Sequence, residues 1–418
     1  MSTTPAPHVL ISGAGIAGLA LALQLVRNGI RATVVERADA PRPGGQAVDL
    51  RGASREVAER MGLMPGIDPR RVHEIGMSYV DGRGRVFGRM SMADFDGEGA
   101  VAEIEIARGD LAAALQEALD EATVAAPGLV EVRYGDRIIA LEQHDDRVAA
   151  RFEHAAPAEF DLVVGADGVH SATRRLAFGP EERYATPLGG YAAFFTLPTP
   201  ADLEPGWFAL RFVPGIAFGL RPDRDPATSK AILTLRVPRD PALRGDRAAQ
   251  EALVRRALEG AGWHADTIVA AMAEASDFYF DELVRIDLDD PVNGRVVLLG
   301  DAASCGSPLT GMGTATALIG AYLLGERIAA QPGDLPAALA RYSSDIAPFT
   351  EAGKAIPFGG LERMVPRSRF AAAMARATTR VMLSKPFLPI MRRMFAAGTP
   401  ELALPTFRPS NVRAHAEV

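Results

Sequence analysis

The feature that most constrains the fold is a glycine-rich turn near the N-terminus. An apolar segment, residues 8–12, runs into Gly13-Ala14-Gly15-Ile16-Ala17-Gly18, and an apolar helical pattern follows over residues 19–28. A second, β-branched segment, residues 31–35, ends at Glu36. A strand, a tight turn, a helix and a second strand in this order predict a βαβ unit with parallel strands. The sequence therefore predicts an α/β protein that begins with a Rossmann-type domain.

The residues of this turn have separate physical tasks. Gly13 permits the tight turn, Gly15 lets the backbone approach a pyrophosphate, and Gly18 lets the helix pack closely on the strand. The helix N-terminus offers free N–H groups to phosphates, whereas Glu36 can accept hydrogen bonds from ribose hydroxyls and would repel the 2′-phosphate of NADP. The alternative is a glycine-rich turn without a ligand. The predicted contacts are Gly13, Ala14, Gly15, Ala17, Gly18, Glu36 and Arg37.

The apolar patterns divide the chain into a discontinuous nucleotide-binding domain and an inserted sheet. Buried-strand patterns return at residues 160–164 and 295–299, whereas residues 185–285 contain alternating stretches typical of a sheet with one covered face. The predicted nucleotide-binding domain comprises residues 1–72, 98–180 and 286–353. The predicted substrate-binding sheet domain comprises residues 73–97 and 181–285. C-terminal helices that bridge both domains are predicted over residues 354–418.

Composition excludes several classes of partner. The chain has 45 Lys and Arg against 52 Asp and Glu, so its formal charge is −7. This charge disfavours non-specific binding to nucleic acid, which needs a basic surface. One Cys, together with seven His that show no paired ligand spacing, disfavours a disulfide scaffold and a metal site. The longest clean apolar stretch, residues 16–26, is too short to span a bilayer. We expect a cytoplasmic monomer or homodimer with a small-molecule substrate and no nucleic-acid or membrane partner.

Two later motifs make the interpretation more specific. Gly165-Ala166-Asp167-Gly168 and Val297-Leu298-Leu299-Gly300-Asp301 each end an apolar strand, in order after the first glycine motif. With this set the chain resembles the class A flavoprotein monooxygenases, the para-hydroxybenzoate hydroxylase-like family, over about residues 8–350. Residues 44–50, Gly-Gly-Gln-Ala-Val-Asp-Leu, are most similar to the tetracycline-inactivating FAD monooxygenases. The resemblance implies a Rossmann-type FAD-binding domain with an inserted β-sheet substrate domain and a C-terminal helical segment.

The resemblance also implies roles for residues outside the first motif. Asp301, after Gly300, would bind the ribityl hydroxyls, and Arg108 would reach the FAD. Asp167 would serve the pyrophosphate and NAD(P)H, although a turn carboxylate without this role is the alternative. Pro308 leads into Gly311, Met312 and Gly313, where the family begins a helix that faces the flavin N1–C2=O edge. In the tetracycline-inactivating relatives a carboxylate at the Asp49 position lies beside the flavin ring, and an arginine at the Arg42 position is linked to NADPH.

Three positions depart from the family pattern. Ser304 stands where His is usual, Met312 replaces a Gln, and Ala315 replaces an Asn. Backbone amides still supply the flavin contacts, so these changes bear on control of the ring and the substrate. Cys305 follows Ser304, and we expect it to be a small buried residue rather than a redox group.

The resemblance implies an oxidoreductase whose FAD is reduced transiently by NADPH or NADH and reacts with O2. The resulting flavin C4a-hydroperoxide would hydroxylate an aromatic or polycyclic, polyketide- or antibiotic-like molecule. No catalytic side chain is identified, because the chemistry is centred on the flavin. Baeyer–Villiger oxidation, epoxidation, a reductase reaction and a non-catalytic flavin-binding protein remain alternatives. Candidate substrate contacts are Phe194, Phe195, Arg211 and Phe218, for each of which ordinary sheet packing is the alternative.

Overall fold

The computed structural model describes residues 6–41, 44–95, 104–356, 360–387, 389–391 and 402–407. Its first sheet is six-stranded, in the order β17-β18-β11-β1-β2-β7. Four of its five neighbouring strand pairs are parallel, and β17 is antiparallel to β18. The bounds are β1 His8–Ser12, β2 Arg31–Glu36, β7 Val130–Tyr134, β11 Leu162–Gly165, β17 Val292–Asn293 and β18 Val296–Leu298.

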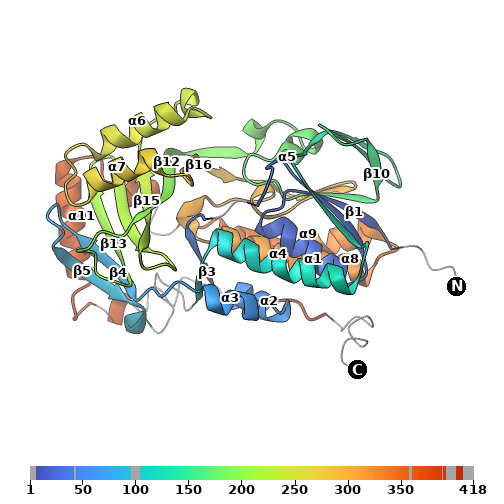
Figure 1. Cartoon of the computed structure of the whole chain (residues 1–418), viewed down its shortest axis with the longest axis horizontal. Coiled ribbons are helices and arrows are strands. Elements are labelled where there is room, and N and C mark those ends of the chain that lie inside the picture. The colour runs from blue at the N-terminus through green and yellow to red at the C-terminus, as the bar shows by residue number, and fades with distance from the viewer. Residues whose placement is uncertain are drawn as a thin grey trace.

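Both faces of this sheet are covered (Figure 1). One face packs on α1 (Ile16–Arg27), α4 (Arg108–Ala125), α8 (Gly313–Ala330) and α9 (Leu335–Gly353) in the largest core of the molecule. The other face packs on an antiparallel sheet of β8 (Ile138–Gln143), β9 (Val148–Phe152) and β10 (Ala158–Phe160). Burial on both faces explains why these parallel strands are continuously apolar rather than alternating.

A seven-stranded sheet forms the other half of the molecule, in the order β16-β12-β15-β14-β13-β4-β5. Only β13 and β4 are parallel neighbours. The helices α6 (Arg247–Leu258) and α7 (Ala265–Glu274) cover one face, and a second hydrophobic core lies between. The bounds are β4 Gly76–Val80, β5 Val86–Ser91, β12 Ala185–Pro198, β13 Trp207–Val213, β14 Ile216–Pro222, β15 Thr228–Leu235 and β16 Tyr279–Ile286.

Shorter elements connect the two halves. The strands β3 (Ala47–Leu50) and β6 (Ile104–Ala107) form an antiparallel pair. The helices α2 (Gly52–Arg60) and α3 (Met64–Ile67) follow β3 in the chain and precede β6. The helix α5 (Ala172–Ala177) follows β11. None of the helices in the described ranges is long and apolar enough to cross a membrane.

The C-terminal segment touches both halves. The helix α11 (Arg369–Met382) follows the short helix α10 (Leu361–Met364) and packs on β5 and β13 of the seven-stranded sheet. Further along, Leu404 enters the core of the first domain, and the Phe407 ring meets Tyr322 edge-on. The predicted fold class is confirmed, whereas the residue bounds of the domains stay a prediction.

Candidate functional site

A cavity of 2720 Å³ lies where the carboxyl ends of β1, β2 and β11 face the seven-stranded sheet. Pockets for drug-sized ligands occupy roughly 300–1,000 Å³. The space is therefore large enough for a dinucleotide together with a second molecule. Its position beyond the carboxyl ends of parallel strands is where open α/β sheets bind their ligands.

The glycine turn after β1 forms one end of this cavity. Gly13 has a φ of 106°, and a Cβ there would lie 2.5 Å from the carbonyl oxygen of Ala166. A Cβ on Gly18 would lie 1.9 Å from the carbonyl oxygen of Gly13, so helix and turn are in direct contact. Gly15, in contrast, has no atom within 4 Å of its Cβ position and lines the cavity at the start of α1. The open space in front of Gly15 and the helix N-terminus fit a pyrophosphate.

Glu36 lies at the end of β2 and lines the same cavity. Its Oε2 accepts a hydrogen bond of 3.0 Å from the Ala14 amide, and its Oε1 accepts one of 2.9 Å from the Ala38 amide. These backbone donors hold the carboxylate beside the turn. Each carboxylate oxygen can accept a further hydrogen bond, which suits a ribose diol.

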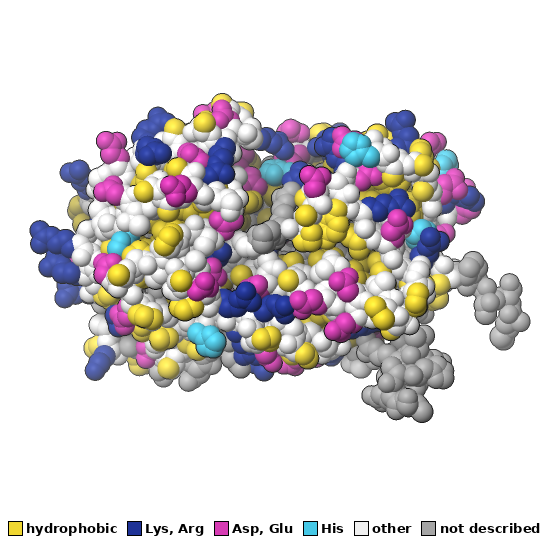
Figure 2. All heavy atoms as spheres, in the orientation of Figure 1, with side chains coloured by type: hydrophobic (Ala, Val, Ile, Leu, Met, Phe, Trp, Pro, Cys, Tyr) yellow, Lys and Arg dark blue, Asp and Glu magenta, His cyan; other side chains and the backbone are white. Residues whose placement is uncertain are grey.

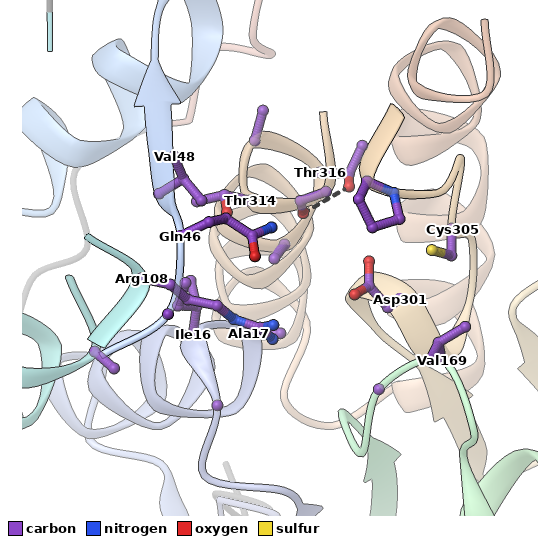
Figure 3. Close-up of a pocket in the computed structure, with 18 of the residues that line it drawn as sticks. Ile16, Ala17, Gln46, Val48, Arg108, Val169, Asp301, Cys305, Thr314 and Thr316 are labelled. Carbon is purple, nitrogen blue, oxygen red and sulfur yellow. Dashed lines mark hydrogen bonds between the residues drawn. The ribbon is translucent and has the colours of Figure 1, made fainter. Parts of the chain in front are cut away.

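Asp301 and Arg108 enter the cavity from opposite sides (Figure 3). Burial raises the pKa of Asp301, while the charge of Arg108 and a hydrogen bond with Cys305 act in the opposite direction. A Cβ on Gly313, the first residue of α8, would lie 3.2 Å from Asp301 Oδ1. A half-buried carboxylate beside a helix N-terminus fits a ligand rich in hydroxyl groups such as the ribityl chain.

The loop before α8 has a constrained backbone. Ser307 adopts a φ of 76°, which is uncommon for a residue with a side chain, and Gly311 adopts a φ of 69°. A Cβ on Gly311 would lie 3.9 Å from Asp49 Oδ1, so the loop and Asp49 face each other across the cavity wall. Asp49 is also ion-paired with Arg51. Backbone strain of this kind occurs at ligand-binding loops.

Asp167 uses its carboxylate within the protein. Its Oδ2 accepts hydrogen bonds from the Thr173 amide and hydroxyl at 2.9 and 3.0 Å, and Ser171 donates to its Oδ1. The side chain therefore stabilises the first turn of α5 while it borders the cavity. This geometry supports the alternative interpretation of Asp167 as a carboxylate that stabilises a turn. A contact between its side chain and a ligand in the cavity stays possible in this geometry.

Most predicted cofactor residues meet in this one space. Gly18 and the buried Gly300 do not line the cavity but pack behind it. Arg42 lies outside the described residues. Those that line the cavity are Gly13, Ala14, Gly15, Ala17, Glu36, Arg37, Asp49, Arg108, Asp167, Asp301, Pro308, Gly311, Met312 and Gly313.

The seven-stranded sheet supplies the opposite wall. Successive side chains of a strand point to opposite faces. Phe194 of β12 pairs in register with Ile232 of β15 and Tyr279 of β16, and its ring stacks on that of Tyr279 at 5.8 Å. Phe208, Arg221 and Lys230 also line this wall.

Two of the four predicted substrate contacts face away from this wall. Arg211 and Phe218 pair in register and do not line the cavity. Arg211 donates to the carbonyl oxygen of Ala261, and Phe218 is fully buried beside Trp263. Phe195 borders the cavity, but its ring packs near Phe278 in the core under α6 and α7. The prediction placed both faces of the sheet in the pocket; for Arg211 and Phe218 it was wrong because they lie on the helix-covered face.

A polar chain that the sequence analysis missed joins the two halves beside the cavity. His170 Nδ1 lies 3.1 Å from Glu181 Oε1, and His170 Nε2 lies 3.1 Å from Asp281 Oδ1. Tyr279 donates to Asp281 Oδ2 at 3.0 Å. The hydrogen bonds that His170 donates to Asp281 and to Glu181 raise its pKa to about 9. The imidazolium therefore holds Asp281, and through it Tyr279, in place at neutral pH.

This pKa predicts a pH dependence of stability. Because the pKa of His170 is higher in the folded than in the unfolded state, its contribution is full below about pH 6.5 and is lost as the pH rises toward 9. We expect His170→Gln to lower the free energy of unfolding by about 2 kcal/mol at pH 6 and by less at pH 9. Urea unfolding at both pH values measures this. The exposed His144→Gln is the control, and an equal loss at both pH values would contradict the prediction.

A second ion cluster lies between the halves. Arg221 of β14 donates to Glu74 Oε2 and Glu105 Oε2, each at 2.7 Å, and to the carbonyl oxygen of Ala47 at 3.0 Å. Both carboxylates are almost fully buried. Burial raises the pKa of Glu74, and the Arg221 charge opposes that shift. The cluster fixes β14 against β3 and β6 of the nucleotide-binding half.

The described residues contain no group of three His, Cys, Asp or Glu that could hold a metal ion. The residues that line the cavity fit an organic dinucleotide: the open backbone at Gly15 fits phosphates, Glu36 fits a ribose and Asp301 fits a polyol.

Known proteins bear out this interpretation. Residues 7–353 match the family described as FAD binding domain. A flavin-dependent monooxygenase from an unknown prokaryotic organism is 32% identical over 90% of this chain and 96% of its own length. An uncharacterized protein of Mycobacterium tuberculosis is 38% identical over 82% of this chain and 90% of its own.

The fold also matches a solved structure. The crystal structure of tetracycline destructase Tet(55) is 30% identical, with a TM-score of 0.77, covering 97% of this chain and all of that one. The predicted family and the predicted FAD cofactor are confirmed. The chain therefore belongs to the FAD-binding family of class A flavin monooxygenases and is an FAD-dependent monooxygenase.

Proposed function

We propose that the enzyme uses NAD(P)H and O2 to hydroxylate a large aromatic or polycyclic molecule. The observation that carries this proposal is the continuity of the cavity, which extends from Gly15 at the dinucleotide end to the stacked rings of Phe194 and Tyr279. A flat aromatic compound can lie against such rings. The tetracycline destructase Tet(55), whose name indicates a polycyclic substrate, supports the same size class.

FAD, when bound, would accept reducing equivalents from NAD(P)H and activate O2. The protein's part is binding, orientation and exclusion of water. The N-terminus of α1 would hold the pyrophosphate, Glu36 the ribose and Asp301 the ribityl hydroxyls. The start of α8 at Gly313 would then face the flavin ring with its positive dipole end.

The substrate would lie between this flavin site and the seven-stranded sheet. Phe194 and Ile232 offer apolar contact, and Lys230 offers a cation at the same wall. Lys230 is held by Asp223 and donates to Thr196 Oγ1 at 2.5 Å, so it is fixed in direction. A polycyclic molecule with oxygen substituents suits an apolar wall that carries a few fixed polar groups. Arg42, which lies outside the described residues, remains our proposed contact for NADPH.

The test is to trace oxygen from labelled O2 into product. Purified enzyme is incubated with FAD, NADPH or NADH, and either tetracycline or one of a panel of polycyclic phenols. The masses of the products are then measured by mass spectrometry. We expect one labelled oxygen atom in the product and substrate-dependent oxidation of NADPH. Ring expansion by one oxygen would indicate Baeyer–Villiger chemistry instead. The proposal would be contradicted if no substrate changed the rate of NADPH oxidation and peroxide were the only product.

A further inference from the structure

The helix α11 has two apolar stripes on opposite sides. Its inner stripe packs on the seven-stranded sheet: Thr379 and the following Leu383 lie against Gly88 of β5, where an added Cβ would be 3.6 and 3.1 Å from them. Met382 and Leu383 join Met90 in a small core. This inner stripe accounts for how α11 is attached to the molecule.

The outer stripe consists of Phe370, Met374 and Val381. These residues are spaced by four and seven positions, so they lie on one face of the helix. Their exposed fractions are 75%, 55% and 51%, and none of them belongs to a hydrophobic core of the described residues. Phe387 and Ile390, just beyond the helix, are also exposed. Single exposed apolar residues are ordinary, but a row of this length marks an interaction surface.

Positive charge lies along one side of the outer stripe. Residues 363–391 contain five arginines and one lysine and no Asp or Glu, in a chain whose formal charge is −7. Arg376 is committed to Asp81 at 3.4 Å and lies over the Phe87 ring. Arg369 and Arg380 form no ion pair with a described residue; they precede Phe370 and Val381 in the sequence and lie along one side of the outer stripe. Lys and Arg side chains also gather at the α11 end of the molecule in Figure 2.

An apolar row flanked by arginines on the outside of a helix complements an anionic lipid surface. A second copy of the chain is less well matched, because a two-fold interface would place the same arginines against one another. This inference revises the expectation of no membrane partner. That expectation rested on the absence of a long apolar run, which a helix that lies in the interface does not need. We propose that α11 docks the enzyme on the surface of an anionic bilayer, with the outer stripe in the acyl boundary and Arg369 and Arg380 on the headgroups.

The experiment measures binding of the full-length, FAD-loaded enzyme to vesicles by co-sedimentation. Vesicles of phosphatidylcholine alone are compared with vesicles in which about 30% of the lipid is anionic phosphatidylglycerol. We expect binding to the anionic vesicles that weakens at high salt. Phe370→Ser, Met374→Ser and Val381→Ser together should weaken it at least about tenfold. Arg369→Gln with Arg380→Gln should weaken it roughly 25-fold, about fivefold per arginine.

The matched control is Val124→Ser, which removes an apolar side chain that is 81% exposed on α4, in the other half of the molecule. It should bind like the unaltered enzyme. Flavin content and thermal unfolding identify any variant that fails to fold. Absence of sedimentation with anionic vesicles, or equal binding by the triple serine variant, would overturn the proposal. A dimer in analytical ultracentrifugation that the triple variant abolishes would assign the stripe to a second copy and would also overturn it.

Discussion

Gly15→Val should give a folded protein that no longer retains FAD. The backbone of Gly15 has φ −80° and ψ −174°, which a valine adopts without strain, and no atom lies within 4 Å of its Cβ position. The new side chain would fill the space in front of the α1 N-terminus. Losing two charge-assisted hydrogen bonds to a phosphate would weaken FAD binding roughly 100-fold. Flavin absorbance of the purified protein and titration of the apoprotein with FAD measure this.

Two further variants separate binding from folding. Gly13→Val places a side chain at φ 106° and 2.5 Å from the Ala166 carbonyl oxygen, so it should cost at least about 2 kcal/mol of folding free energy. Asp301→Ala should fold and weaken FAD binding by removing the hydroxyl acceptor. The exposed Glu351→Ala is the control for loss of a carboxylate. FAD that co-purifies with Gly15→Val at one per chain would show that the pyrophosphate lies elsewhere.

The dinucleotide end of the site could be predicted from the sequence because its determinants are local. Gly13, Gly15 and Gly18 act within one turn, and Glu36 follows at the end of the next strand. Strand, turn and helix patterns place such residues at the carboxyl edge of the sheet without knowledge of distant contacts. The later motifs at Asp167 and Asp301 follow strands of the same sheet, so the same reasoning brought them together.

The substrate wall could not be predicted in the same way. Alternation separates Phe194 from Phe195, but it does not say which of the two faces the cavity. That choice depends on α6 and α7, which follow later in the chain and cover one face. The same holds for Arg221 and Arg211, which lie on neighbouring strands. Arg221 lines the cavity wall, whereas Arg211 lies on the opposite face and bonds to Ala261, between α6 and α7.

Arg221→Met should destabilise the fold more than any surface change. The substitution leaves Glu74 and Glu105 almost fully buried without the guanidinium that each one contacts at 2.7 Å. Removing one partner of a buried ion cluster costs about 3–5 kcal/mol, because the remaining charge is left uncompensated. Arg285→Met, which breaks a half-exposed pair with Asp287, should cost less than about 1 kcal/mol. Urea unfolding at fixed FAD concentration compares the two.

The pH dependence of this loss identifies its cause. Burial already raises the pKa of Glu74, and removal of the Arg221 charge raises it further, so the folded variant is favoured when the carboxylates are protonated. For groups whose pKa is higher in the folded state, stability is retained at low pH and lost as the pH rises. The loss should therefore be smaller at pH 5 than at pH 8, and smaller again when Glu74→Gln and Glu105→Gln accompany Arg221→Met. The loss of stability could instead be the same at both pH values and unchanged by the two glutamines. That result would mean that packing of the Arg221 side chain, and not its charge, holds β14 against the nucleotide-binding half.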